Sequence, residues 1–260
     1  MKNLFFLGDL HGNFNYILWQ LKQEIIKDAH LIQVGDFGLG FIDYEKDIHN
    51  MTEINKSLIK NNVHLWVIRG NHDNPLFWNG HVDGKWENLH LVKDYTVQNL
   101  SGYNVLFVGG ALSIDRKGRL NDMQQYASKG VKKELYWFDE NFNLDIDKLK
   151  ELKEIDIVVT HTAPDFCYPN NKFGFSPIVD SLAKYDPELK AELIAERNLI
   201  TDMYNVIMEN NNPRMWFYGH FHTSKIDNFN GVEFRLLDIN EVFIYRDKDY
   251  EDELNQLYGN

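Results

Sequence analysis

The residues of this chain that are best suited to chemistry are aspartate, asparagine and histidine side chains in five short motifs. The first motif is Gly8-Asp9-Leu10-His11-Gly12, which directly follows the apolar run Leu4-Phe5-Phe6-Leu7. An apolar run bounded by glycine predicts a short buried strand, so we expect Asp9 and His11 on the loop at its carboxyl end. A carboxylate oxygen and an imidazole nitrogen are donors that suit a divalent metal ion. One such pair alone is more typical of ordinary loop hydrogen bonding.

Residues of the same types follow four further apolar runs. These runs predict strands at 31–34, 63–68, 155–159 and 215–218. Eight side chains of ligand type lie at the ends of the five runs: Asp9, His11, Asp36, Asn71, His72, His161, His220 and His222. Parallel strands joined by right-handed crossovers share a direction, so we expect these side chains at one sheet edge, where open α/β sheets bind ligands. Five such loops make a chance arrangement a poor explanation.

The segments between these runs predict the elements that position the loops. Helical spacing of apolar residues predicts helices at 13–27, capped by Asn13, and at 44–61, which gives a β-α-β-α-β start. Further helices are expected at 147–153 and 187–210. A loop with a short helix is expected at 120–145, a lid-like segment at 164–178, and strands of a second sheet at 232–239 and 242–245.

Composition and charge indicate one large α/β domain. The chain has 260 residues, of which 43% are hydrophobic and 14% aromatic, enough for a sizeable core. The formal charge of −12 makes a long nucleic acid an unexpected partner, although a small phosphorylated substrate or nucleotide could reach a cationic site. We expect a domain at 1–246 and an acidic tail at 247–260; the sequence does not indicate an oligomeric state.

The single cysteine, Cys167, allows no internal disulfide, which favours a cytoplasmic location. No segment is expected to enter a membrane or to direct secretion. The remaining histidines are expected to be surface residues or hydrogen-bonded core residues: His30, His49, His64, His81 and His90.

Two other motifs have alternative interpretations. Arg116, Lys117 and Arg119 form a basic cluster in an acidic chain, and Arg116 and Arg119 are candidate substrate-binding residues, although a solvated loop is the simpler interpretation. The sequence Asp36-Phe37-Gly38 is like the magnesium motif of protein kinases. The glycine-rich loop and the His-Arg-Asp loop of a kinase are both missing, which excludes that interpretation.

The five motifs together resemble those of a known family. In order, they are Gly8-Asp9-Leu10-His11, Gly35-Asp36, Gly70-Asn71-His72-Asp73, Thr160-His161 and Gly219-His220-Phe221-His222. This set is similar to the motif set of the calcineurin-like metallophosphoesterases, and the run from Gly109 to Arg116 is similar to bacterial and phage members. The resemblance implies an α/β fold in four layers (α/β/β/α), with two mixed sheets flanked by helices.

The resemblance also implies two divalent metal ions. One ion would be held by Asp9, His11 and His222. The second would be held by Asn71, His161 and His220. Asp36 would bridge both, and a shared carboxylate offsets the repulsion between cations that lie ~3.5–4 Å apart. The mixed nitrogen and oxygen donors suit transition metals, with manganese expected first and iron, zinc, nickel or cobalt as alternatives.

The implied reaction is hydrolysis of a phosphate ester, in which a hydroxide that bridges the metals attacks phosphorus in line. His72 would protonate the leaving oxygen, and Asp73 would orient the His72 ring. The substrate could be a phosphodiester or nucleotide, or a small phosphomonoester. A serine/threonine protein phosphatase is disfavoured, because no arginine follows Gly35-Asp36-Phe37-Gly38. A non-catalytic metal-site scaffold that binds a protein, and a purely structural metal site, are the remaining alternatives.

Overall fold

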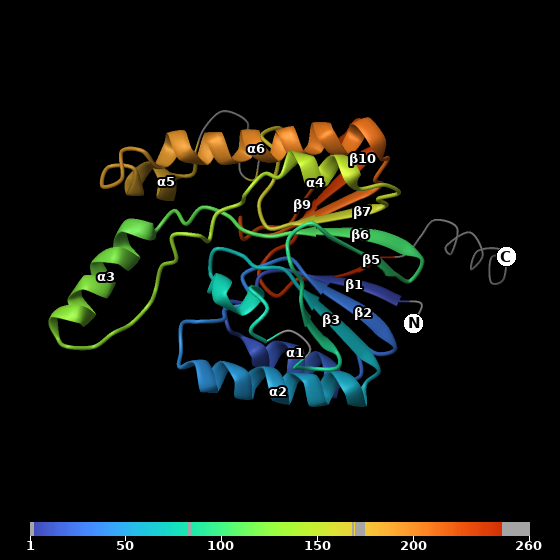
Figure 1. Ribbon diagram of the computed structural model, residues 1–260, viewed down its shortest axis with the longest axis horizontal. Coiled ribbons are helices and arrows are strands. Elements are labelled where there is room, and N and C mark those ends of the chain that lie inside the picture. The colour runs from blue at the N-terminus through green and yellow to red at the C-terminus, as the bar shows by residue number, and fades with distance from the viewer. Residues whose placement is uncertain (1–2, 83–84, 168, 170–174, 246–260) are drawn as a thin grey trace.

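Two β-sheets lie face to face, with helices on both outer sides (Figure 1). The computed structural model describes residues 3–82, 85–167, 169 and 175–245. Both sheets contain parallel and antiparallel strand pairs. This arrangement confirms the α/β sandwich of two mixed sheets that the resemblance implied.

The first sheet has the strand order β11-β1-β2-β3-β4. Its strands are β1 (Asn3–Leu7), β2 (Ala29–Gln33), β3 (Val63–Val67), β4 (Leu89–Leu91) and β11 (Val242–Tyr245). The four strands β1 to β4 are parallel, and β11 joins β1 antiparallel. Helices α1 (Phe14–Lys22) and α2 (Tyr44–Lys60) lie below this sheet in Figure 1, and a short 3₁₀ helix spans Pro75–Trp78.

The second sheet has the strand order β5-β6-β7-β8-β10-β9. Its strands are β5 (Thr96–Leu100), β6 (Tyr103–Val108), β7 (Ile157–Thr160), β8 (Met215–Tyr218), β9 (Lys225–Phe229) and β10 (Val232–Leu236). The remaining helices are α3 (Arg116–Ser128), α4 (Ile146–Glu151), α5 (Pro177–Leu182) and α6 (Leu189–Asn210). Helices α4 and α6 cover the outer face of the second sheet, and α3 projects to one side (Figure 1).

The alternation of side chains along the strands builds separate cores on the two faces of each sheet. On β1, Phe5 and Leu7 pack in the core shared with α1 and α2, whereas Leu4 and Phe6 pack in the core between the sheets. The Phe6 ring stacks on the ring of Phe217 from the second sheet, with centroids 3.5 Å apart. Burial on both faces explains why the strands appear in the sequence as continuous apolar runs.

Three expectations about elements were wrong. Helix α1 ends at Lys22 rather than at 27, because Glu24 takes a left-handed conformation with φ of 53°, and no side-chain hydrogen bond from Asn13 caps the helix. Residues 116–119 belong to helix α3 rather than to a solvated loop, and α3 continues to Ser128, into the region where a short helix was expected. Strand β11 belongs to the first sheet, not to the second.

Two predicted segments fall partly or wholly outside the described residues. The acidic tail at 247–260 lies entirely outside them, as does the domain boundary at 246. The lid-like segment at 164–178 includes residues 168 and 170–174, which are also outside. None of the helices in the described part of the chain combines the length and the apolar character that a bilayer crossing requires.

Candidate metal centre

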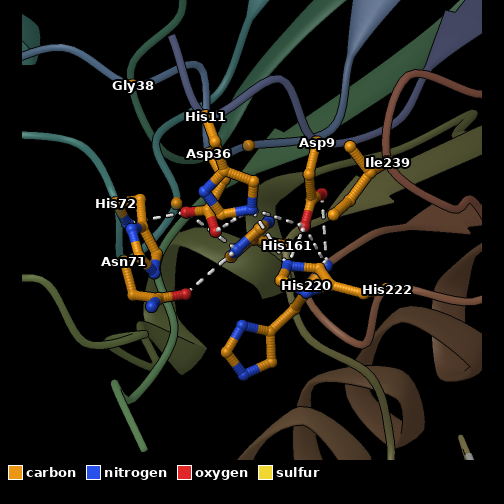
Figure 2. A network of polar contacts seen from close by, with 12 residues as sticks. Asp9, His11, Asp36, Gly38, Asn71, His72, His161, His220, His222 and Ile239 are labelled. Atoms are coloured by element: carbon orange, nitrogen blue, oxygen red, sulfur yellow. Dashed lines mark hydrogen bonds and ion pairs between the residues drawn. The ribbon is translucent and has the colours of Figure 1, made fainter. Parts of the chain in front are cut away.

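The five motifs meet where the carboxyl ends of strands from both sheets face each other. Asp9 and His11 follow β1, Asp36 follows β2, and Asn71 follows β3 in the first sheet. In the second sheet, His161 follows β7, and His220 and His222 follow β8. The predicted single sheet edge is therefore wrong in one respect: two sheets, not one, supply the loops. The side chains nevertheless point toward one another (Figure 2).

The first group of donors consists of Asp9, His11, Asp36 and His222, whose potential ligand atoms all lie within 4.8 Å of one another. His222 Nε2 lies 3.3 Å from Asp9 Oδ2 and 2.9 Å from His11 Nε2. His11 Nε2 lies 3.7 Å from Asp36 Oδ2. Two imidazole nitrogens and two carboxylates that converge on one small space have the donor types and the spacing for a divalent cation.

The second group consists of Asp36, His161 and His220, again with ligand atoms within 4.8 Å. His161 Nε2 lies 3.2 Å from Asp36 Oδ1 and 3.2 Å from the amide oxygen of Asn71. Asp36 therefore belongs to both groups, with Oδ1 toward His161 and Oδ2 toward His11. The structure thus brings all seven predicted ligands together.

Hydrogen bonds from outside the site orient two of these donors. His161 Nδ1 lies 2.8 Å from the carbonyl oxygen of Val34, and a proton donated there leaves Nε2 free to bind a cation. The Asn71 amide nitrogen donates to Ser113 Oγ at 3.0 Å, which turns the amide oxygen toward His161. Contacts of this kind hold ligands in place in metal sites.

Ser113 belongs to a chain of polar residues that the sequence did not identify. Its backbone N–H donates to Glu140 at 2.9 Å, and the Glu140 carboxyl group is fully buried. Burial raises the pKa of Glu140 to about 8. Ser113 lies in the run from Gly109 to Arg116, and the similarity of that run to family members is a signal that could have marked Ser113 as a site residue. Glu140 lies in an irregular region, and no motif in the sequence around it indicates a place in the site.

The buried carboxylate at the centre of the site needs positive charge nearby. Burial alone would raise the pKa of Asp36, but the charge of His161 and its hydrogen bond hold that pKa well below its ordinary value. Burial would likewise lower the pKa of His161, but Asp36 raises it to about 10. A metal cation between these groups would balance the negative charge of Asp36 as protonated His161 does. The donor set therefore fits the metal ions that the resemblance implies.

The loops that carry the ligands are held in unusual conformations. Four of the seven candidate ligands have left-handed backbones: His11, Asp36, His220 and His222, with φ values from 48° to 71°. This region is sparsely populated for residues other than glycine, and such strain concentrates at functional sites. The sandwich framework must therefore impose these conformations on the loops.

Two motif glycines make room for a ligand from another loop. A Cβ atom on Gly70 would lie 2.1 Å from Asp36 Oδ1, and one on Gly219 would lie 2.1 Å from Asp9 Oδ1. Neither glycine has a positive φ, so the close approach of a carboxylate is the reason that a side chain is not tolerated. Gly70 and Gly219 thus each leave space for a ligand that another motif supplies.

His72 lies beside the two donor groups and contacts Arg119. Its ring lies 4.5 Å from the His11 ring, and Arg119 Nη2 lies 2.5 Å from His72 Nε2. Because a guanidinium group can only donate, Nε2 accepts and the ring proton lies on Nδ1. Burial, opposed by Asp36 and assisted by Arg119, lowers the pKa of His72 to about 4.

The predicted contact between Asp73 and the His72 ring is not what the structure shows. Both carboxylate oxygens of Asp73 instead accept backbone N–H groups, from Gly70 at 2.8 Å and from Gly38 at 2.7 Å among others. Asp73 therefore ties the second motif to the third, and Arg119 is the residue that orients His72. The shape of the loop, which sequence spacing does not reveal, determines that Arg119 rather than Asp73 contacts the His72 ring.

The two candidate substrate-binding arginines are placed differently. Arg119 is buried next to the site, where it donates to the Asn71 carbonyl at 3.2 Å and pairs with Asp115 at 2.9 Å. Arg116 pairs with Asp186 and Glu192 and does not line the cavity at the metal centre. Neither arginine is on a solvated loop, and Arg116 is not brought to the site.

Comparisons with known proteins agree with this geometry. The family model described as calcineurin-like phosphoesterase matches residues 2–224. A search of curated proteins finds no match to the sequence. Among solved structures, the chain is similar to TT1561 of Thermus thermophilus, with 14% identity, a TM-score of 0.52, and coverage of 94% of this chain and 98% of that one. This likeness shows the fold alone.

A second solved structure is the phosphopantetheinyl hydrolase PptH from Mycobacterium tuberculosis. The two chains are 15% identical, with a TM-score of 0.49, and the match covers 92% of this chain and 90% of that one.

Proposed function

We propose a function from the premise that the chain belongs to the calcineurin-like phosphoesterase family, as the match over residues 2–224 shows. The protein is a metal-dependent hydrolase of phosphate esters. The observation that carries this proposal is the position of Asp36, whose two oxygens face two separate groups of metal-binding side chains. A site for one structural ion would need only one group.

Members of this family typically bind two divalent metal ions, and the structure has candidate ligands for both. Asp9, His11 and His222 would hold one ion together with Asp36. Asn71, His161 and His220 would hold the other, again with Asp36. When bound, two cations lower the pKa of a water molecule and stabilise the charge that develops on a phosphoryl group.

His72, Arg119 and Asp73 complete the site, and we assign to them the protonation of the leaving group and the positioning of the proton donor. His72 carries its ring proton on Nδ1, because Arg119 donates to Nε2. We assign to His72 the donation of that proton to the leaving oxygen, which would leave an imidazolate balanced by the Arg119 guanidinium, and to Arg119 the orientation of the ring. Asp73 fixes the two loops on which Asp36 and His72 stand.

Manganese is our first expectation for the metal, with iron, zinc, nickel and cobalt as alternatives that the same donors accept. The substrate is a small phosphorylated molecule, either a diester or nucleotide or a monoester. A long nucleic acid is disfavoured by the formal charge of −12. A cytoplasmic location remains a prediction from the single cysteine.

The test is hydrolysis of a chromogenic phosphomonoester and a chromogenic phosphodiester by the full chain in manganese. We expect turnover of at least one ester, loss of that turnover with a chelator, and its loss in Asp36→Asn, which removes the charge shared by both donor groups. Lys117→Gln, on the exposed face of α3, is the control that should keep wild-type turnover. A protein that binds manganese but hydrolyses neither ester would support the scaffold alternative instead.

A further inference from the structure

The metal centre opens into a cavity of about 710 Å³ that is far larger than a phosphate group needs. Its floor includes His11, Asp36, His220 and His222. Cavities of roughly 300–1,000 Å³ are typical of sites that enclose small organic ligands. A phosphate at the donor groups would leave most of this space for the rest of a substrate molecule.

A second part of the cavity lining is apolar. Helices α5 and α6, on the second-sheet side of the molecule (Figure 1), form it together with neighbouring segments. Its apolar side chains include Ile114, Phe175, Ile178, Val179, Leu182 and Leu193. Val179 and Leu193 pack in a small core with Leu112 and Leu189, so this apolar wall is held in place by the fold.

The polar side chains on this wall already have partners within the protein. Ser176 caps α5 by accepting the Val179 N–H, and Asp115 pairs with Arg119 at 2.9 Å. Arg197 Nη2 donates to the carbonyl oxygens of Pro164 and Asp165 at 2.8 and 3.1 Å. Among the described lining residues, these groups are engaged in holding the wall, which offers a ligand mainly apolar contact.

We infer that the α5–α6 wall binds the organic group of the substrate and that this group is apolar, so that the substrate class is an aliphatic or aromatic phosphate ester. The phosphate would lie at the metal centre and the apolar group against Ile178, Val179 and Leu193. This inference rests on the proposed function, because it takes the donor groups as the phosphate site. It favours such esters over nucleotides, whose sugar hydroxyls would meet few free polar partners here.

The test uses alkylphosphonates, which cannot be hydrolysed at the carbon–phosphorus bond, from methyl- to hexylphosphonate. Their dissociation constants are measured by calorimetry on the manganese-loaded full chain. Burial of a methylene group contributes about 0.8 kcal/mol, so affinity should rise about two- to fourfold for each carbon that enters the cavity. Equal affinity across the series, or no binding of any member, would overturn the inference.

A pair of matched variants locates the effect on the wall. Ile178 on α5 is 63% exposed and lines the cavity, whereas Ile194 on α6 is 51% exposed and does not. Neither contributes much to the core, so both variants should fold. Ile178→Ser should weaken hexylphosphonate at least threefold and leave methylphosphonate unchanged, and Ile194→Ser should change neither. Equal effects of the two variants would contradict the assignment.

Hydrolysis assays on the same preparations separate this inference from the proposed function. If affinity rises with chain length but no phosphate ester is turned over, the apolar wall stands and the hydrolase proposal fails. If esters are hydrolysed but KM is the same for methyl and hexyl esters, the hydrolase stands and the inference about the wall fails.

Discussion

Asp36 shows how a single residue can organise a whole site. Its side chain is buried, it faces both groups of donors, and its backbone is held at a φ of 56°. Its Oδ1 also accepts the His72 N–H at 2.6 Å, so the shared ligand and the proposed proton donor are linked directly. Any change at Asp36 should therefore affect metal binding and His72 together.

His72→Gln should lower kcat by roughly 10²- to 10⁴-fold, the usual contribution of a positioned acid or base. Manganese binding should persist, because His72 belongs to neither donor group. Turnover and metal stoichiometry measured on the same sample provide the test. A variant with wild-type kcat would show that another group protonates the leaving oxygen.

Gly219→Ala should weaken manganese binding, because the added Cβ would meet Asp9 Oδ1 at 2.1 Å and displace a ligand. The expected loss is about 10- to 100-fold in affinity, as for changes that misplace a ligand through its surroundings. Gly118→Ala is the matched control, since a Cβ there meets nothing within 4 Å and alanine favours the helix. Titration with manganese measures both; equal affinities would refute the crowding argument.

At the scale of elements, α3 depends on very few contacts. Arg119 is the only buried residue of this helix, and Arg116 ties its first turn to Asp186 and Glu192. The helix nevertheless supplies the arginine that orients His72. Its stability therefore bears on catalysis although it packs little apolar surface.

Arg116→Gln should loosen α3 without unfolding the sandwich, because it removes the ion pairs that hold the start of the helix. Hydrogen exchange should become faster at the α3 amides and stay unchanged in β1, β2 and β3. Lys117→Gln, which alters an exposed neighbour on the same helix, should leave exchange unchanged. Unaltered exchange in α3 of the Arg116 variant would show that other contacts hold the helix.

The predictability of each element follows from how it is stabilised. The strands that carry the site were predictable because they are buried on both faces and appear as unbroken apolar runs. The start and extent of helix α3 were not, because this helix has no apolar face for periodicity to reveal. Strand β9 was also missed, since its side chains are mostly exposed. Spacing located eight side chains of the site, but the resemblance separated His72 from the seven ligands and divided those seven into two groups.

Features of the site that depend on three-dimensional contact could not be predicted. The Arg119 contact with His72 joins residues 47 positions apart, and Glu140 reaches Ser113 across 27. Nothing in the local sequence of either pair indicates the contact. The resemblance implied that Asp73 orients His72, but the loop turns the Asp73 carboxylate toward the backbone of the other motif.

At the scale of the molecule, a group of histidines lies in the first sheet away from the metal centre. His30, His64 and His90 come from β2, β3 and β4 and contact one another or Trp66. Burial, and then the neighbouring histidines, lower the pKa values of His30 and His90 to about 4. Burial also lowers the pKa of His64, opposed by Glu87. The folded protein thus keeps these rings neutral.

This group of histidines should therefore lower the stability of the folded protein as the pH falls from 7 toward 4. In the unfolded chain His30 and His90 bind protons near pH 6.5, whereas in the folded protein their pKa values are about 4, so protonation of these two rings favours unfolding in that window. In urea titrations, the change in stability from pH 7 to pH 5 should be less unfavourable for His90→Gln than for the wild type, because the variant lacks one of these rings. His49→Gln, on the exposed face of α2, should match the wild type. Identical losses in all three would exclude this group as the cause.

The most direct test of the account is a crystal structure of the manganese-loaded protein with anomalous scattering recorded for the metal. We expect two peaks, separated by roughly 3.5–4 Å, with the Asp36 carboxylate between them. One peak should lie among Asp9, His11 and His222, and the other among Asn71, His161 and His220. A single peak, or peaks that Asp36 does not contact, would contradict the proposal that five loops of two sheets build a centre for two cations.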